Sequence, residues 1–99
     1  MSHLKKHEII TVNYFGSKKT EQFLNSLALA GCNSKVIIID NSTSSDEEHR
    51  LKTALENTTY KGEIELVISH QNTGYFGAVS SIVNKISEDA EWCIVCNND

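Results

Sequence analysis

Three features of the sequence predict an α/β fold in which an open parallel sheet alternates with helices. First, short apolar runs alternate strictly with stretches whose apolar residues recur at helical spacing. Second, residues 36–39 and 92–96 are continuously apolar, as is typical of parallel strands covered on both faces. Third, a polar cluster follows each run. Right-handed crossovers between parallel strands are the simplest topology for this β-α-β-α-β-α-β order.

The predicted elements can be bounded from the pattern. The strands are rich in β-branched residues and cover residues 8–12, 36–39, 64–68 and 92–96. The helices have apolar stripes three and four positions apart, over residues 20–28, 51–55 and 76–86. Ser17 is the predicted N-cap of the first helix and Gly31 its stop, while Ser45-x-x-Glu48 is the predicted capping box of the second. Residues 1–7 are predicted to be a tail and residues 8–99 one domain.

The composition is that of a small globular domain. The chain has 99 residues, of which 39% are hydrophobic and 22% charged, and its net charge is −4. This mild acidic balance gives no support for binding to nucleic acid or to an anionic membrane. No apolar run reaches the length of a membrane span, and the N-terminus lacks an apolar signal region. We therefore expect a cytoplasmic protein.

The three cysteines are expected to be reduced core residues. They are Cys32, Cys93 and Cys96, an odd number in a reducing compartment. Cys93 and Cys96 have C-x-x-C spacing, but no second pair completes a zinc site, and positions three apart on a strand point to opposite faces.

The polar clusters are expected to meet at one edge of the sheet. They follow the four strands, at residues 13–14, 40–42, 70–74 and 97–99. The carboxyl ends of parallel strands share an edge, and open α/β sheets bind their ligands there. We expect the strand order 3-2-1-4, which brings Asn13 beside Asn97–Asp99. The competing interpretation of each cluster is an ordinary polar turn.

Four motifs, in this order and spacing, resemble the N-terminal half of a family 2 glycosyltransferase. They are Val12-Asn13-Tyr14, Ile38-Ile39-Asp40-Asn41-Ser42, Asn72-Thr73-Gly74-Tyr75-Phe76-Gly77 and Asn97-Asn98-Asp99. The resemblance covers the chain from Glu8 onward and is strongest to the bacterial rhamnosyltransferase-like branch that builds surface polysaccharides. It implies a GT-A fold with a three-layer, Rossmann-like sheet. It also implies hexosyl or rhamnosyl transfer from a nucleotide-diphosphate sugar to a saccharide or lipid-linked saccharide acceptor.

The resemblance also implies site residues, by position. The first motif would border the nucleotide, the second would lie near the base, and the third would face the nucleotide and diphosphate. The implied nucleotide-sugar ligands are Asn13, Tyr14, Asp40, Asn41, Asn72 and Gly74. A glycine suits close backbone approach at a helix start, although a plain turn would also explain it.

The last motif stands at the position of the family's metal-binding carboxylates. The resemblance implies that Asp99 binds Mg²⁺ or Mn²⁺, hard cations that take carboxylate and phosphate oxygens. The metal would offset the charge of the departing nucleoside diphosphate.

The sequence departs from the family pattern in two places. Ser80 and Ile82 stand where the family often has an asparagine and a glycine. The family's acceptor-binding half and general base lie beyond the metal motif, so no catalytic residue is predicted within this chain. We expect a glycosyltransferase fragment that transfers no sugar alone, binds nucleotide weakly, and self-associates through the surface left by truncation. A peripheral place at the inner face of the membrane is compatible with the intact enzyme.

Two other functions fit the pattern. A non-catalytic nucleotide-binding or interaction module that ends naturally at Asp99 would carry the same sheet edge. A phosphorelay receiver domain fits the alternation, but it requires paired acids after the first strand, where this chain has Asn13 and Tyr14.

Overall fold

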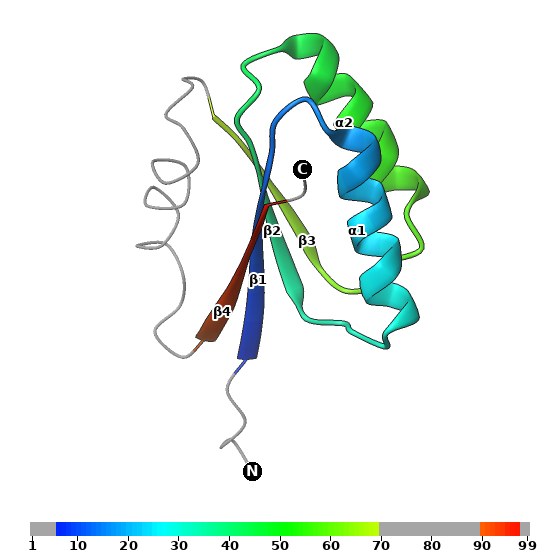
Figure 1. Cartoon of the computed structure of the whole chain (residues 1–99), viewed down its shortest axis with the longest axis vertical. Coiled ribbons are helices and arrows are strands. Elements are labelled where there is room, and N and C mark those ends of the chain that lie inside the picture. The colour runs from blue at the N-terminus through cyan, green and yellow to red at the C-terminus, as the bar shows by residue number, and fades with distance from the viewer. Residues whose placement is uncertain (1–5, 70–89, 98–99) are drawn as a thin grey trace.

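A computed structural model describes residues 6–69 and 90–97 of the chain, with only the backbone described for residues 6, 7 and 90–97. Within these ranges, four strands form one parallel sheet, and two helices connect the first three strands (Figure 1). The elements are β1 (Lys6–Asn13), α1 (Ser17–Leu29), β2 (Lys35–Asp40), α2 (Ser45–Asn57), β3 (Ile64–Ile68) and β4 (Ala90–Asn97).

The predicted α/β class with an open parallel sheet is confirmed. The strands lie in the order β3-β2-β1-β4, and both described helices pack side by side on one face of the sheet (Figure 1). The predicted helix over residues 76–86, on which a three-layer arrangement depends, lies outside the described residues. Neither α1 nor α2, each of 13 residues, is long and apolar enough to cross a bilayer.

The register of the sheet brings the carboxyl ends of its strands together. Asn13 pairs with Asp40, and Val12 pairs with Asn97. At the other end β1 begins at Lys6, two residues before the predicted boundary between tail and domain. The reason is that Lys6 and His7 extend the ladder to the first residues of β4.

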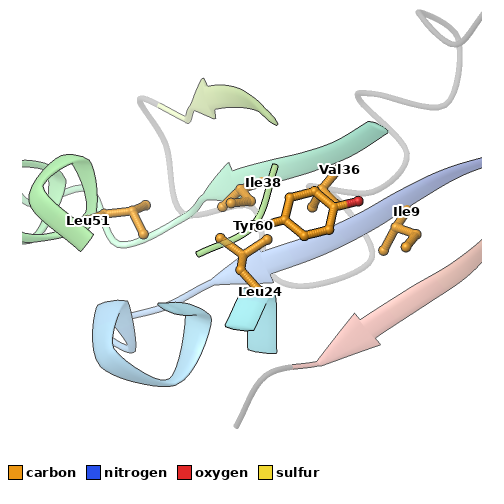
Figure 2. Close-up of a cluster of buried hydrophobic side chains, with 6 residues drawn as sticks. All are labelled: Ile9, Leu24, Val36, Ile38, Leu51 and Tyr60. Carbon is orange, nitrogen blue, oxygen red and sulfur yellow. The ribbon is translucent and has the colours of Figure 1, made fainter. Parts of the chain in front are cut away.

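Apolar residues are buried on both faces of the sheet. The cluster under the helices contains Ile9, Leu24, Val36, Ile38, Leu51 and Tyr60 (Figure 2). The intervening strand residues are also buried, namely Ile10, Val12, Ile37 and Ile39. Coverage of both faces is what the continuously apolar run over residues 36–39 predicts.

Each of the two helices starts one residue earlier than predicted. Gly16, not Ser17, is the N-cap of α1, and it supplies no side-chain cap. Ser44, not Ser45, is the N-cap of α2, and its hydroxyl accepts a hydrogen bond from the Glu47 amide at 3.2 Å. The predicted N-caps are therefore wrong, because each of these serines is the first helical residue.

The predicted stop of α1 at Gly31 is confirmed. Gly31 has a left-handed φ of 78°, which glycine adopts without strain. Its amide donates to the Ala28 carbonyl, and the Cys32 amide donates to the Leu27 carbonyl at 2.9 Å. These two bonds form a Schellman motif, which satisfies carbonyls that the helix end would otherwise leave without partners.

The loop before β3 contributes to the core, although its sequence predicts only a connection. Tyr60 is buried, and its hydroxyl donates to the Ser34 carbonyl and contacts Cys32 Sγ. Asn25 on α1 accepts a hydrogen bond from the Thr58 hydroxyl at 2.6 Å. The loop is thus fixed to α1 and to the segment before β2.

Candidate functional site

The site begins with two polar residues on the face of the sheet that carries the helices. Side chains alternate along a strand, so Asn13 shares a face with Ile9, and Asp40 shares a face with Ile38. Ile9 and Ile38 belong to the core under α1 and α2. Asn13 and Asp40 therefore extend the same face past the apolar core to the carboxyl edge.

Asn13 is the centre of a buried hydrogen-bond network. Its Nδ2 donates to Asp40 Oδ1 at 3.2 Å and to Glu47 Oε2 at 2.9 Å, and its Oδ1 accepts from the Thr20 hydroxyl at 2.7 Å. All four residues are at most 2% exposed. The amide thus uses both hydrogens and its oxygen internally, and this buried network (Asn13, Thr20, Asp40 and Glu47) joins β1, β2, α1 and α2.

Glu47, like Thr20, is a member of the network that the sequence pattern did not identify as a site residue. Its Oε2 also accepts from the Ser17 amide at 3.0 Å, and its Oε1 accepts from Arg50 Nε at 3.2 Å. The carboxylate therefore fixes the first turn of α1 against the first turn of α2. One signal was available, because Glu47 lies four positions before Leu51 and so continues the apolar stripe of α2.

The structure brings three of the predicted ligands together. Asn13, Asp40 and Asn41 are 0%, 1% and 3% exposed, and the Asn41 amide donates to the Asn13 carbonyl at 2.9 Å. Their convergence agrees with the predicted edge, but their side chains face the interior. Both Nδ2 hydrogens of Asn13 are already donated, so this nitrogen can donate to a ligand only if one of its internal hydrogen bonds breaks.

Tyr14 is the predicted ligand that faces solvent. Tyr14 and Phe15 are each 52% exposed, and their rings meet edge to face with centroids 4.9 Å apart. Phe15 has a φ of 51°, a conformation that is strained for a bulky residue. The Phe15 amide donates to Ser42 Oγ at 2.8 Å, so the loop after β2 holds the loop after β1 in this shape.

A cleft opens beside these rings, between the first turns of α1 and α2. Its volume is about 450 Å³, and its charged lining residues are Lys18, Lys19, Glu47 and Arg50. A second hollow of about 290 Å³ shares Lys18 and Arg50 with it and continues between the two helices. The cleft lies next to the carboxyl ends of β1 and β2.

Among the described residues, the side chains with a shifted pKa lie at the opposite edge of the sheet. Burial raises the pKa of Tyr60, and a hydrogen bond to Glu65 raises the pKa of Lys35. A backbone hydrogen bond from Ser34 lowers the pKa of the Cys32 thiol. None of these three residues lines the cleft, so their shifts belong to the packing at the amino edge.

The other predicted ligands fall outside the described residues. These are Asn72, Gly74 and the metal ligand Asp99. Within residues 6–69 and 90–97, no group of three His, Cys, Asp or Glu side chains is arranged to hold a metal ion. The metal site thus stays a prediction that rests on the resemblance.

Comparisons with protein-family models, with curated proteins and with solved structures find no match for this chain. The geometry of the described residues and the resemblance of the motifs are therefore what support a function.

Proposed function

We propose that the chain is the donor-nucleotide-binding part of a metal-assisted glycosyltransferase with a GT-A fold. The observation that carries the proposal is the half-exposed Tyr14 ring at the carboxyl end of β1. Open parallel sheets bind ligands at this edge, and an exposed aromatic ring there offers a stacking surface for a nucleotide base. The order of the four motifs supports the same function.

The buried network gives Asn13 and Asp40 a definite role in this proposal. They hold the start of the Tyr14 loop by hydrogen bonds to two helices and a neighbouring strand. Rigid support of this kind lowers the entropy lost on binding. Asn13 and Asp40 then act by positioning Tyr14, and Asn41, whose amide bonds to the same strand end, belongs to that support.

The metal assignment rests on the end of β4. Asn97 pairs with Val12, so the last motif begins at the same edge as Asn13 and Tyr14. A carboxylate at Asp99 suits Mg²⁺ or Mn²⁺, which would offset charge on the leaving diphosphate. Asn72 and Gly74 are proposed to contact the nucleotide and its diphosphate.

The test is titration of the protein with UDP-sugar and dTDP-sugar donors, with and without Mn²⁺, followed by NMR so that weak affinities are measurable. We expect Tyr14→Ala to weaken binding about tenfold, because stacking on a base contributes about 1–3 kcal/mol. Tyr14→Phe keeps the ring and is the matched control. Equal affinity of the Ala and Phe variants would refute the stacking role.

The metal is tested separately, in a chain extended past Asp99 so that the terminal carboxylate does not chelate. We expect Asp99→Asn to remove the effect of Mn²⁺ on donor binding. Binding that is metal-independent in both forms would instead favour a non-catalytic nucleotide-binding module.

A further inference from the structure

The cleft between α1 and α2 is positively charged in an acidic protein. Lys18, Lys19 and Arg50 line it, which are three of the nine Lys and Arg residues of a chain whose net charge is −4. The acid in the lining is Glu47, which is 2% exposed. The side chains that reach solvent in the cleft therefore present positive charge.

The Glu47 carboxylate already has hydrogen-bond partners within the protein, and it orients Arg50. Its carboxylate accepts hydrogen bonds from Asn13, Ser17 and Arg50 Nε. Arginine has five N–H donors, of which Nε supplies one. The Arg50 side chain is 57% exposed, and no other described group accepts a hydrogen bond from it. The guanidinium is thus held at one nitrogen and can offer its other donors to a ligand.

The two lysines occupy positions that helix stability disfavours. They lie in the first turn of α1, where the helix dipole favours acidic residues, and this turn contains none. Neither Lys18 nor Lys19 forms an ion pair with a described residue. A bound anion would relieve this repulsion. Residues whose charge destabilises the helix in which they lie are expected where those residues bind a ligand.

The rings of Tyr14 and Phe15 add an apolar wall beside the cations. Both line the cleft and both are half exposed. Aromatic faces bind flat bases and the apolar faces of sugars, and a phosphate monoester carries a charge of about −1.5 to −2 near pH 7. Such a charge matches three cations opposed by one paired carboxylate.

We propose that the α1–α2 cleft binds a phosphate monoester attached to a ring, the chemistry shared by nucleoside monophosphates and sugar phosphates. This site lies between the helices, requires no metal, and is lined by residues between positions 14 and 50 of the sequence. It shares Tyr14 with the donor site of the proposed function, but its three cations, Lys18, Lys19 and Arg50, are not part of that site.

The first test is titration with inorganic phosphate, uridine, UMP and glucose 1-phosphate in EDTA, monitored by amide and Arg Nε signals in ¹H–¹⁵N NMR. We expect UMP and glucose 1-phosphate to shift the signals of Lys18, Lys19 and Arg50 and to bind more tightly than inorganic phosphate. If UMP binds more tightly, the natural ligand is a nucleoside monophosphate; if glucose 1-phosphate binds more tightly, it is a sugar phosphate. The proposal is overturned if uridine binds as well as UMP, or if neither monoester shifts these signals.

The second test compares Lys18→Gln/Lys19→Gln with Lys52→Gln/Lys61→Gln, which removes two exposed charges elsewhere. The first variant should weaken monoester binding about 2- to 30-fold, since each exposed ion pair contributes about 0.2–1 kcal/mol, and the second should leave it unchanged. If both double variants weaken monoester binding equally, the effect is one of overall charge, and the proposed site is refuted. If the unchanged protein binds the monoester but shows no Mn²⁺-dependent binding of a sugar donor, the proposed function is contradicted and the monoester site is not.

Discussion

Asn13 and Glu47 are 34 positions apart, and a 2.9 Å hydrogen bond from Nδ2 of Asn13 to Oε2 of Glu47 joins them in the interior. This contact links the end of β1 to the first turn of α2. The buried network can therefore be tested by stability measurements that need no ligand.

Replacing Glu47 by alanine should strongly destabilise the fold. The substitution removes the acceptor for Asn13 Nδ2 and for the Ser17 amide. A buried donor without a partner costs about 1–3 kcal/mol, so we expect the free energy of unfolding to fall by at least about 2 kcal/mol in urea denaturation. Glu48→Ala, which removes only the exposed pair with Lys52, is the control and should cost about 0.5 kcal/mol or less. Similar losses for the two variants would contradict the network.

Asn13→Asp should make stability depend on pH. The new carboxylate would replace an amide that now donates to Asp40 and Glu47, so three carboxylates would meet in a buried space. Like charges raise the pKa of such a group in the folded state above its unfolded value. Stability should then fall as pH rises through the acidic range and be partly recovered at low pH.

The measurement for Asn13→Asp is the urea midpoint between pH 4 and pH 8, relative to the unchanged protein. Asn33→Asp makes the same chemical change at an exposed loop position and should show little pH effect. A flat difference across this range for Asn13→Asp would contradict the burial of the site.

Gly62→Ala should destabilise the loop before β3. A Cβ at this position would lie 2.8 Å from the Asn33 carbonyl oxygen and 2.7 Å from Cε2 of Tyr60. Because one of these atoms is backbone and the other belongs to a buried ring, we expect a loss of about 1–3 kcal/mol in thermal or urea unfolding. Gly31→Asn is the comparison. It meets no atoms within 4 Å, and asparagine tolerates a left-handed φ, so its cost should be smaller.

Lys35→Gln should lower the stability of the fold slightly at neutral pH, and this loss should disappear at alkaline pH. The amine donates to Glu65 at 2.8 Å, which raises the pKa of Lys35 above its usual 10.5. The charged amine is favoured by folding, so its contribution is full below pH about 10 and is lost as pH rises through the folded-state pKa. We expect a cost of about 0.2–1 kcal/mol at pH 7, because the pair is partly exposed. A cost that persists unchanged at pH 12 would show that the side chain acts by packing.

The sheet could be predicted from the sequence because its signals are local. The β-branched run over residues 36–39 and the glycine at position 31 each specify one conformation over a few residues. The starts of the helices could not be predicted in the same way. Ser44-x-x-Glu47 and Ser45-x-x-Glu48 fit the capping box equally well, and what distinguishes the two frames is a contact of Glu47 with Asn13 from a distant segment.

The sequence predicts where the candidate site lies, but it does not predict which of its residues are buried and which face solvent. Asn13, Tyr14 and Asp40 were expected at one edge because parallel strands end together. Which of them reach solvent depends on partners from the helices, and no local pattern specifies that Thr20 and Glu47 bond to Asn13. The burial of Tyr60, in a segment that reads only as a loop, has the same cause.

The division between buried and exposed polar residues at this edge has a consequence for how the protein can be altered. Asn13, Thr20, Asp40 and Glu47 satisfy one another, so a change at any of them has to be matched by changes at the others. The exposed side chains at positions 14, 15, 18 and 19 form no hydrogen bond with this network, whereas Arg50 is joined to it through Glu47. Ligand preference can therefore be redesigned at these four positions without changing the buried residues that support them.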